Sequence, residues 1–262
     1  MRLHCFSTGS IFVPFESIHL NKFRPELLEI PIPWFVVDHP DALVIVDGGN
    51  PLAVANDHVQ HWGEAIQGCE VIMDPAEACI PTLNVAGFDL SRPTVLVQTH
   101  LHSDHVGALA ASDQLNISRV VVARREYDYA IAPDWHLAAE YIQSDFDKAD
   151  LPWDLVSDSA DGYDVLGDGT LLMHHTPGHT PGHMSIELAL PQTGTVLLTG
   201  DAAYTQSHWN RESLPGYVAS TVDAVRSVEK LRKRAEFRSA RVFFGHDIEQ
   251  WRSMEMNGKS YA

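Results

Sequence analysis

Four side chains that can bind a metal fall within six residues of this sequence. His100, His102, Asp104 and His105 follow directly after the apolar, β-branched stretch 94–98, which is typical of a buried strand. Imidazole suits zinc, and a carboxylate can act as a further ligand or as a bridge. On a loop that leaves a strand, the first two histidines project to the same side, whereas the last two residues begin the next turn and can face a second point. The spacing therefore favours a metal cluster over solvated or capping histidines.

Three further side chains of the same types stand at later strand ends. His179, Asp201 and His246 each follow a glycine and lie just past a predicted strand, with gaps of 74, 22 and 45 residues from His105 onward. Strand ends at one edge of a layered α/β fold converge, so residues far apart in sequence can meet there. Seven candidate ligands suffice for two metal ions, with one carboxylate as a bridge and a water or hydroxide between the ions.

The elements that must position these residues alternate between strands and helices. Strands are predicted at 1–10, 34–37, 42–46, 94–98, 119–122, 170–176, 184–188, 195–199 and from 241 to the glycine before His246. Helices are predicted at 53–66, 74–86, 108–111, 124–131, 134–147 and 220–237. The last of these helices has Ser220 and Asp223 as a capping-box-like start, and its buried stripe is predicted as Val222, Val225, Val228, Leu231 and Ala235.

Two segments have no standard pattern. Residues 11–33 contain four prolines, so they are predicted to be irregular, and their apolar content suits a lid or a surface excursion pinned to the core. Residues 124–163 are rich in aromatic side chains, which are core or the wall of a pocket for an apolar group. His58 and His61, three residues apart on a predicted helix, are expected to be exposed. Asp47 is either a partner of a metal-binding residue or a turn residue.

Composition limits the class of protein. The chain has 262 residues without a linker, repeat or low-complexity segment, so residues 1–262 are expected to form a single domain. A formal net charge of −17 disfavours nucleic acid and anionic membranes as partners. The sequence has no stretch that predicts a membrane span or a secretory signal. Cys5, Cys69 and Cys79 form no C-x-x-C pair, so we expect reduced thiols and a cytoplasmic location.

Four motifs together resemble the signature of the metallo-β-lactamase superfamily: Thr99-His-Leu-His-Ser-Asp-His105, Thr176-Pro-Gly-His179, Thr199-Gly-Asp201 and Gly245-His246. The resemblance covers most of the chain from the Asp47-Gly-Gly turn onward. It implies an αββα sandwich, in which two mixed sheets are flanked by helices.

The same resemblance assigns roles to the candidate ligands. It places His100, His102 and His179 around one metal ion. It places Asp104, His105 and His246 around the other ion, with Asp201 as the bridge. His183, in a repeated Pro-Gly-His, would be structural rather than a ligand. The ions are expected to be zinc, although cobalt, manganese or iron suit the same nitrogen and oxygen ligands.

Tyr204 narrows the choice of reaction. It stands three residues after Asp201, an arrangement that resembles the N-acyl-homoserine lactonase branch, in which this tyrosine hydrogen-bonds the lactone. The alternative is an ordinary core or surface aromatic. The low content of basic residues argues against RNA processing, and the short stretch after His246 leaves no room for an added substrate domain.

The resemblance implies a small acylated lactone as substrate and its ring opening as the reaction. A hydroxide between two metal ions would attack the lactone carbonyl, Tyr204 would stabilise the oxyanion, and Asp104 or Asp201 would pass a proton to the leaving ring oxygen. Ser103 stands where some of these lactonases carry a large apolar residue, which leaves the acyl-chain preference open. The alternatives are an organophosphate or aryl-ester hydrolase with the same site and a non-catalytic metal-binding protein. Formation of a homodimer also stays open.

Overall fold

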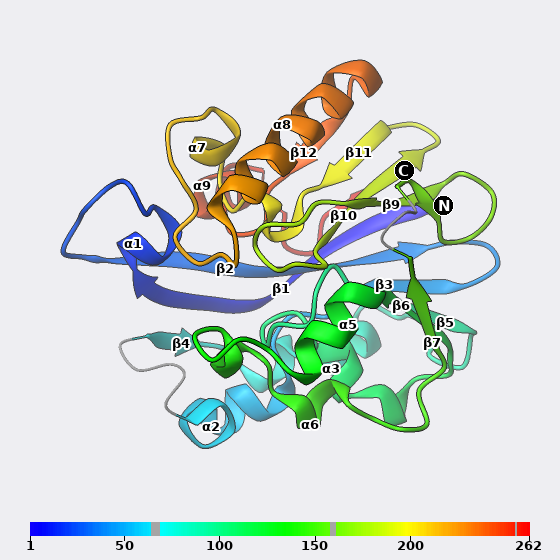
Figure 1. Cartoon of the computed structure of the whole chain (residues 1–262). Helices are drawn as coiled ribbons and strands as arrows, with labels where there is room; N and C mark the ends of the chain where they lie inside the picture. The colour runs from blue at the N-terminus through cyan, green and yellow to red at the C-terminus, as the bar shows by residue number, and fades with distance from the viewer. Residues whose placement is uncertain (64–68, 158–160, 255) are drawn as a thin grey trace.

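The polypeptide folds into two β-sheets that pack face to face, with helices on their outer sides (Figure 1). This computed structural model describes residues 1–63, 69–157, 161–254 and 256–262. Its strands are β1 (Arg2–Pro14), β2 (Leu27–Asp38), β3 (Leu43–Val46), β4 (Glu70–Ile72), β5 (Thr94–Val97), β6 (Ile117–Ala123), β7 (Trp153–Val156), β8 (Tyr163–Asp164), β9 (Leu171–His175), β10 (Met184–Leu190), β11 (Gly194–Leu198), β12 (Arg241–Phe243) and β13 (Ser260–Tyr261).

Both sheets are mixed. The larger sheet has the order β13-β1-β2-β3-β5-β6-β7, with β4 paired to β1, and its strands from β3 to β7 run parallel. The smaller sheet has the order β12-β11-β10-β9-β8, and its β11–β12 pair is parallel. Parallel neighbours end at the same edge, so the segments after β3 and β5, and those after β11 and β12, leave their sheets together.

The helices are short apart from two. They are α1 (Phe15–Ile18), α2 (Leu52–Trp62), α3 (Cys79–Val85), α4 (Gly107–Ala110), α5 (Arg124–Ile131), α6 (Gln143–Phe146), α7 (Gln206–Trp209), α8 (Thr221–Arg238) and α9 (Ile248–Ser253), with 3-10 turns η2 (Pro75–Glu77), η3 (Ser112–Gln114), η4 (Ala138–Glu140) and η5 (Gly200–Ala202). In Figure 1, α3, α5 and α6 lie beside the larger sheet, and α7 and α8 lie beside the smaller one. Within the described residues, no helix is long and apolar enough to cross a membrane.

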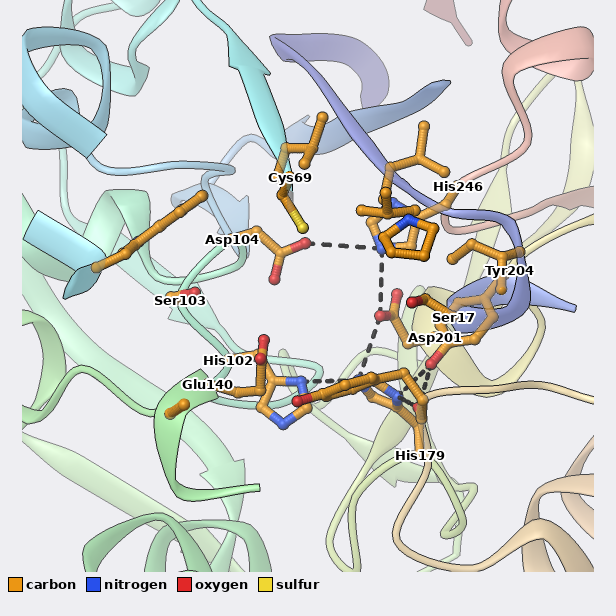
Figure 2. Close-up of a pocket in the computed structure, with 18 residues that line it drawn as sticks. Ser17, Cys69, His102, Ser103, Asp104, Glu140, His179, Asp201, Tyr204 and His246 are labelled. Carbon is orange, nitrogen blue, oxygen red and sulfur yellow. Dashed lines mark hydrogen bonds and ion pairs between the residues drawn. The ribbon is translucent and has the colours of Figure 1, made fainter. Parts of the chain in front are cut away.

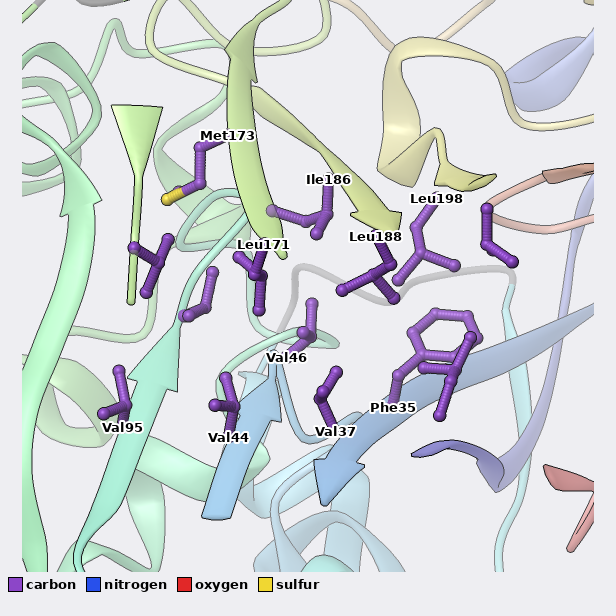
Figure 3. Packing of buried hydrophobic residues seen from close by; sticks show 14 of the residues in the cluster. Phe35, Val37, Val44, Val46, Val95, Leu171, Met173, Ile186, Leu188 and Leu198 are labelled. Carbon is purple, nitrogen blue, oxygen red and sulfur yellow. The ribbon is translucent and has the colours of Figure 1, made fainter. Parts of the chain in front are cut away.

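Side chains alternate between the two faces of each strand, and this alternation separates the inner layer of the fold from the outer ones. Phe35, Val37, Val44 and Val46 face inward and meet Leu188 and its neighbours from the smaller sheet (Figure 3). The alternate residues of β2 and β3 face outward and pack under α3 and α4. This arrangement is the predicted αββα sandwich of two mixed sheets flanked by helices.

The prediction of irregular structure over residues 11–33 is wrong for residues 11–14 and 27–33, which belong to β1 and β2. β1 and β2 pair almost continuously from Arg2↔Asp38 to Pro14↔Leu27, with a register shift between Ser7 and Ser10. Pro31 and Pro33 are tolerated because β3 pairs with β2 only over Phe35–Asp38. At these two prolines β2 has no second neighbour in the described part of the sheet, so the missing N–H groups break no ladder.

Several predicted helices have different bounds. The helix expected at 134–147 is two separate turns, η4 and α6. The helix expected at 74–86 begins at Asp74, as predicted, with a capping box, but η2 gives way to α3 at Ala78. The helix expected at 53–66 is α2, and residues 64–66 of that prediction lie outside the described residues.

The buried stripe of α8 is only partly as predicted. Val228, Leu231 and Ala235 are buried, but Val222 and Val225 are 60% and 41% exposed. A spacing of three residues repeated over several turns drifts around a helix of 3.6 residues per turn, so the buried face at the start of α8 is instead Ala224.

A matched pair of substitutions tests which face of α8 is buried. Val228→Ala removes methyl groups that pack under the helix, and we expect the free energy of unfolding to fall by about 1.5–3 kcal/mol. Val222→Ala, on the exposed side, is expected to change it by less than about 0.5 kcal/mol. Urea unfolding followed by circular dichroism measures both, and equal losses would contradict this orientation of α8.

Candidate metal centre

The structure brings the seven predicted ligands together. Five of them line one pocket, which is shown in Figure 2: His102, Asp104, His179, Asp201 and His246. Six of the seven are buried, and the side chain of Asp104 is 17% exposed. They come from four loops, which follow β5, β9, β11 and β12. The pocket is a cavity of about 240 Å³ that opens beside them.

The first group contains three histidines. The Nε2 atom of His179 lies 3.0 Å from Nε2 of His100 and 2.9 Å from Nδ1 of His102. Ligand atoms 2.0–2.1 Å from a tetrahedral ion lie roughly 3.3 Å apart, so these nitrogens surround a space of the right size. Burial lowers the pKa of all three imidazoles. The neutral form is the form that binds a cation.

The second group contains Asp104, His105 and His246. The Oδ2 atom of Asp104 lies 3.6 Å from Nε2 of His105 and 3.7 Å from Nε2 of His246. Burial alone would lower the pKa of both histidines, but the carboxylates of Asp104 and Asp201 raise it.

Asp201 lies between the two groups. Its Oδ2 atom is 3.3 Å from Nε2 of His179 and 3.2 Å from Nε2 of His246. Although burial opposes it, the surrounding imidazoles of His246 and His105 hold the pKa of this carboxyl well below its usual range.

The unpaired atoms of the site fit divalent cations. Oδ1 of Asp201 and Nε2 of His105 are buried without a hydrogen-bond partner and lie 3.6 Å apart, which is too far for a hydrogen bond. Orphaned buried polar atoms cost free energy unless something else contacts them. Nitrogen and carboxylate donors at these separations suit zinc and similar ions.

Outer partners fix the orientation of the rings. Nδ1 of His105 lies 2.9 Å from Oδ2 of Asp47. The Asp47 carboxylate is itself held by Thr99, whose hydroxyl donates to Oδ2 and whose backbone N–H donates to Oδ1. Nδ1 of His246 lies 2.8 Å from the carbonyl oxygen of Pro31. Donation from the far nitrogen leaves the other nitrogen free to face the centre. Of the two roles considered for Asp47, the structure favours the partner of a metal-binding residue.

His183 lies behind the centre, as predicted, and is not among its converging donors. Its Nε2 atom accepts from the backbone N–H of Asp201 at 3.0 Å, and its Nδ1 atom is 2.9 Å from the Thr176 hydroxyl. Burial lowers the pKa of His183 to about 3, which keeps the ring neutral and able to accept. This histidine therefore holds the backbone of the central carboxylate.

Tyr204 is buried beside the centre, and its hydroxyl is already engaged. Its oxygen lies 2.7 Å from Nδ1 of His179, and the hydroxyl donates to the carbonyl oxygen of Tyr217. Burial, together with Asp201 and Asp104, raises the pKa of Tyr204 well above its usual value, so the hydroxyl stays protonated. In this arrangement Tyr204 supports a metal-binding ring as well as facing the pocket.

Sequence reasoning missed Glu126. This fully buried residue of α5 accepts from the backbone N–H of Leu101 at 3.0 Å, from the hydroxyl of Thr180 and from that of Tyr141. Its carboxyl group therefore ties the loop after β5 to the loop after β9. Burial raises the pKa of Glu126 to about 6. Nothing in the helical pattern around it signals this contact, because its partners are distant in sequence.

The pocket has two unlike walls. The apolar wall comes from the first part of the chain and consists of Ile11, Val13, Pro14, Ile18, Ile30 and Trp62. The opposite wall includes Ser103, Glu140 and Tyr217. Of the aromatic segment 124–163, the pocket receives only Ala139 and Glu140 among the described residues, and most of its aromatic side chains pack in the core under the larger sheet.

The segment suggested as a lid is pinned in place. The backbone N–H of Leu20 donates to the carbonyl of Leu214 at 2.9 Å, and Nε2 of His208 lies 3.0 Å from the carbonyl oxygen of Ile18. These bonds join the end of α1 to α7, and the residues just after α1 to the loop that carries Tyr217. Away from the centre, His58 and His61 are half-buried rather than exposed, because the His61 ring packs on Asp145 at 2.8 Å.

This chain is similar to known proteins over most of its length. The model of the metallo-beta-lactamase superfamily matches residues 29–246. The N-acyl homoserine lactonase AttM of Azorhizobium caulinodans is 43% identical over 256 residues, which cover 97% of this chain and 96% of that protein. AttM of Agrobacterium fabrum is 41% identical over 263 residues, which cover 100% of this chain and 99% of that protein.

A solved structure has the same fold. It is an N-acyl homoserine lactone hydrolase with the product N-hexanoyl-L-homoserine bound at the catalytic metal centre. The TM-score is 0.84 at 25% sequence identity, and the superposition covers 96% of this chain and 95% of that chain.

The bond between Asp47 and His105 can be tested through metal affinity. Asp47→Ala frees the His105 ring to turn, and we expect zinc affinity to fall by roughly 10–100-fold. Asp41→Ala, which removes a carboxylate that is 90% exposed, is the matched control and should leave the affinity unchanged. Competition with a chromophoric chelator measures both. Equal affinities for Asp47→Ala and the wild type would show that Asp47 has no part in metal binding.

Proposed function

Because the chain belongs to the metallo-β-lactamase superfamily, we propose that it is a metal-dependent hydrolase that opens the lactone ring of N-acyl homoserine lactones. One observation carries the proposal: seven histidine and aspartate side chains converge, and five of them line a pocket that has an apolar wall. The full-length similarity to curated N-acyl homoserine lactonases supports the choice of substrate.

The donors suit two divalent ions, with zinc as the expected metal. His100, His102 and His179 would hold one ion, and Asp104, His105 and His246 would hold the other. Asp201, which lies between the groups, would contact both ions. Bound divalent cations supply Lewis acidity and lower the pKa of water, which provides a nucleophile at neutral pH.

The residues of the chain would then direct the charge that develops on the substrate. The Tyr204 hydroxyl keeps its proton and would donate it in a hydrogen bond to the lactone carbonyl oxygen, in exchange for its bond to Tyr217. A well-placed donor of this kind contributes about 3–4 kcal/mol. Asp104 is the most accessible of the seven side chains. It would accept a proton from the attacking water and pass it to the ring oxygen as the bond between that oxygen and the carbonyl carbon breaks.

The apolar wall would receive the acyl chain. Ile11, Ile18, Ile30 and Trp62 belong to one buried cluster that borders the pocket. Each methylene group that this wall takes out of water stabilises the complex by about 0.8 kcal/mol. The substrate is therefore a small amphiphilic molecule whose polar ring lies at the centre.

Two broader proposals follow from the whole chain. A continuous core between the two sheets supports a single domain over residues 1–262. Cys5, Cys69 and Cys79 are free thiols, which supports a reducing, cytoplasmic setting.

Metal stoichiometry tests the centre itself. We expect two zinc ions per chain, one ion in His246→Ala because the second group loses a donor, and no turnover of N-hexanoyl-homoserine lactone after chelation. Added zinc should restore turnover. Elemental analysis of dialysed protein, with His136→Ala as a control at an exposed histidine, measures the ions. A fully active protein with a single ion would contradict the two-ion centre.

Tyr204→Phe separates the two contacts of this hydroxyl. If it donates to the substrate, kcat should fall by about 100- to 1,000-fold while both ions remain bound. Tyr163→Phe, which removes a half-buried hydroxyl bonded to Asp154, is the control and should keep wild-type kcat. Loss of an ion in parallel with kcat would mean instead that Tyr204 acts through His179.

No lactone turnover by the wild type with two ions bound would contradict the lactonase proposal and direct the search to phosphotriesters and aryl esters.

A further inference from the structure

Glu140 presents a carboxyl group to the pocket from the wall opposite the apolar residues. It ends η4, and its backbone carbonyl accepts from the N–H of Ser103 at 2.8 Å. This bond fixes Glu140 to the loop that carries His102 and Asp104. Figure 2 shows its side chain next to Ser103 and His102, inside the cavity that Tyr204 also lines.

Glu140 is half-buried, and its carboxyl group has few partners among the described residues. The hydroxyl of Tyr217 donates to it, and no ion pair to it is found among the described residues. Fully buried carboxyl groups of this chain have more partners: Glu126 accepts from Leu101, Tyr141 and Thr180, among others, and Glu187 is paired with Arg234 and Arg238. Burial, with a further contribution from Asp104, raises the pKa of Glu140 to about 7.

Tyr217 sets the position of this carboxyl group relative to the centre. Its backbone carbonyl accepts from the Tyr204 hydroxyl and lies 2.9 Å from Nδ1 of His179, while its own hydroxyl reaches Glu140. One residue thus connects a metal-binding ring to the polar wall. A carboxyl group that accepts one hydrogen bond retains further acceptor sites. A ligand with a suitably placed donor can form a hydrogen bond to such an acceptor site.

An N-acyl homoserine lactone has such a donor. Its amide nitrogen is attached to the ring carbon next to the lactone carbonyl, so the N–H and the carbonyl oxygen are close together on one face of the molecule. With the carbonyl oxygen at Tyr204 and the centre, the amide would reach the cavity wall nearby. The acyl chain beyond it would continue along the apolar wall.

We propose that Glu140 accepts a hydrogen bond from the amide N–H of the substrate and thereby selects lactones that carry an α-amide over alkyl lactones. The inference rests on the proposed lactonase function and names a specificity-determining residue for it. Glu140 forms and breaks no covalent bond in this role. The Tyr217 hydroxyl holds the carboxyl group in place.

The test compares two substrates that differ at the amide. N-hexanoyl-homoserine lactone carries the N–H, and an α-alkyl-γ-butyrolactone of the same chain length does not. For Glu140→Ala, we expect kcat/KM for the amide lactone to fall roughly 10- to 100-fold, mainly through KM, as is typical of a lost hydrogen bond to a charged group. The alkyl lactone should be turned over at the wild-type rate, within about twofold.

Further variants keep the result interpretable. Glu140→Gln preserves the shape and one acceptor oxygen, so it should recover part of the preference for the amide. Glu212→Ala removes an exposed carboxylate and is the matched control. Zinc content is measured for every variant, and calorimetry with the ring-opened product N-hexanoyl-homoserine reports binding without turnover. Its affinity should fall in Glu140→Ala by the same factor as kcat/KM.

The outcomes are distinguishable. An equal fall for both lactones, or no fall for either, would overturn the role of Glu140 while the lactonase activity of the wild type stands. A wild type that opens neither lactone would overturn the proposed function and this inference with it. A selective loss for the amide lactone, with zinc content unchanged, would establish the contact.

Discussion

The face-to-face packing of the two sheets is the constraint on which the rest of this structure depends. Neither sheet holds a complete centre: the larger one supplies the loop with His100, and the smaller one supplies those with His179, Asp201 and His246. The apolar layer between the sheets, where Val46 meets Leu188 and Leu198, therefore sets the distances between donors (Figure 3). Close packing makes that layer stiff, and the bonds of Glu126 to Leu101 and Thr180 join loops of the two sheets, so separations of about 3 Å between ring nitrogens can be maintained.

Hydrogen bonds from residues around the candidate ligands fix the orientation of the histidine rings that the two sheets bring together. Asp47 has a positive φ of 66°, an unfavourable conformation for a residue other than glycine, at the turn that ends β3. Its partners explain why the conformation is kept: Thr99 donates to it twice, and His105 contacts it. Gly107 begins α4, just after the loop that carries His105, and a side chain at this position would meet the carbonyl oxygen of Gly48 at 2.4 Å. Strain and tight approach thus occur together beside the centre.

The sequence predicts best what is local. The candidate ligands between His100 and His105 are recognisable because their spacing follows one strand end, and the glycines before Asp201 and His246 mark two more. The fold class follows from the same motifs. What the sequence does not reveal are contacts between backbone and distant side chains, such as Pro31 with His246 or Leu101 with Glu126.

The errors have a common physical cause. The prolines of residues 11–33 predict a break in regular structure, but the effect of a proline in a strand depends on whether a neighbouring strand needs the missing N–H. Beside Pro31 the described sheet has β1 on one side of β2, but β3 does not extend to this position on the other side, so the strand continues. Likewise, the exposure of Val222 depends on where α8 meets the smaller sheet, which spacing alone does not determine.

The two walls of the pocket differ in how closely they are coupled to the metal centre. The apolar wall includes Ile30, whose neighbour Pro31 holds the His246 ring through its carbonyl oxygen. A backbone shift in β2 that made room for a longer acyl chain would therefore also move a metal-binding residue. The polar wall is coupled mainly through Tyr217, because its carbonyl contacts His179 and its hydroxyl contacts Glu140. A substitution of Glu140 removes only the contact with the Tyr217 hydroxyl and leaves the contact between Tyr217 and His179 in place. Substrate selection can therefore vary at Glu140 while the candidate metal ligands keep their positions.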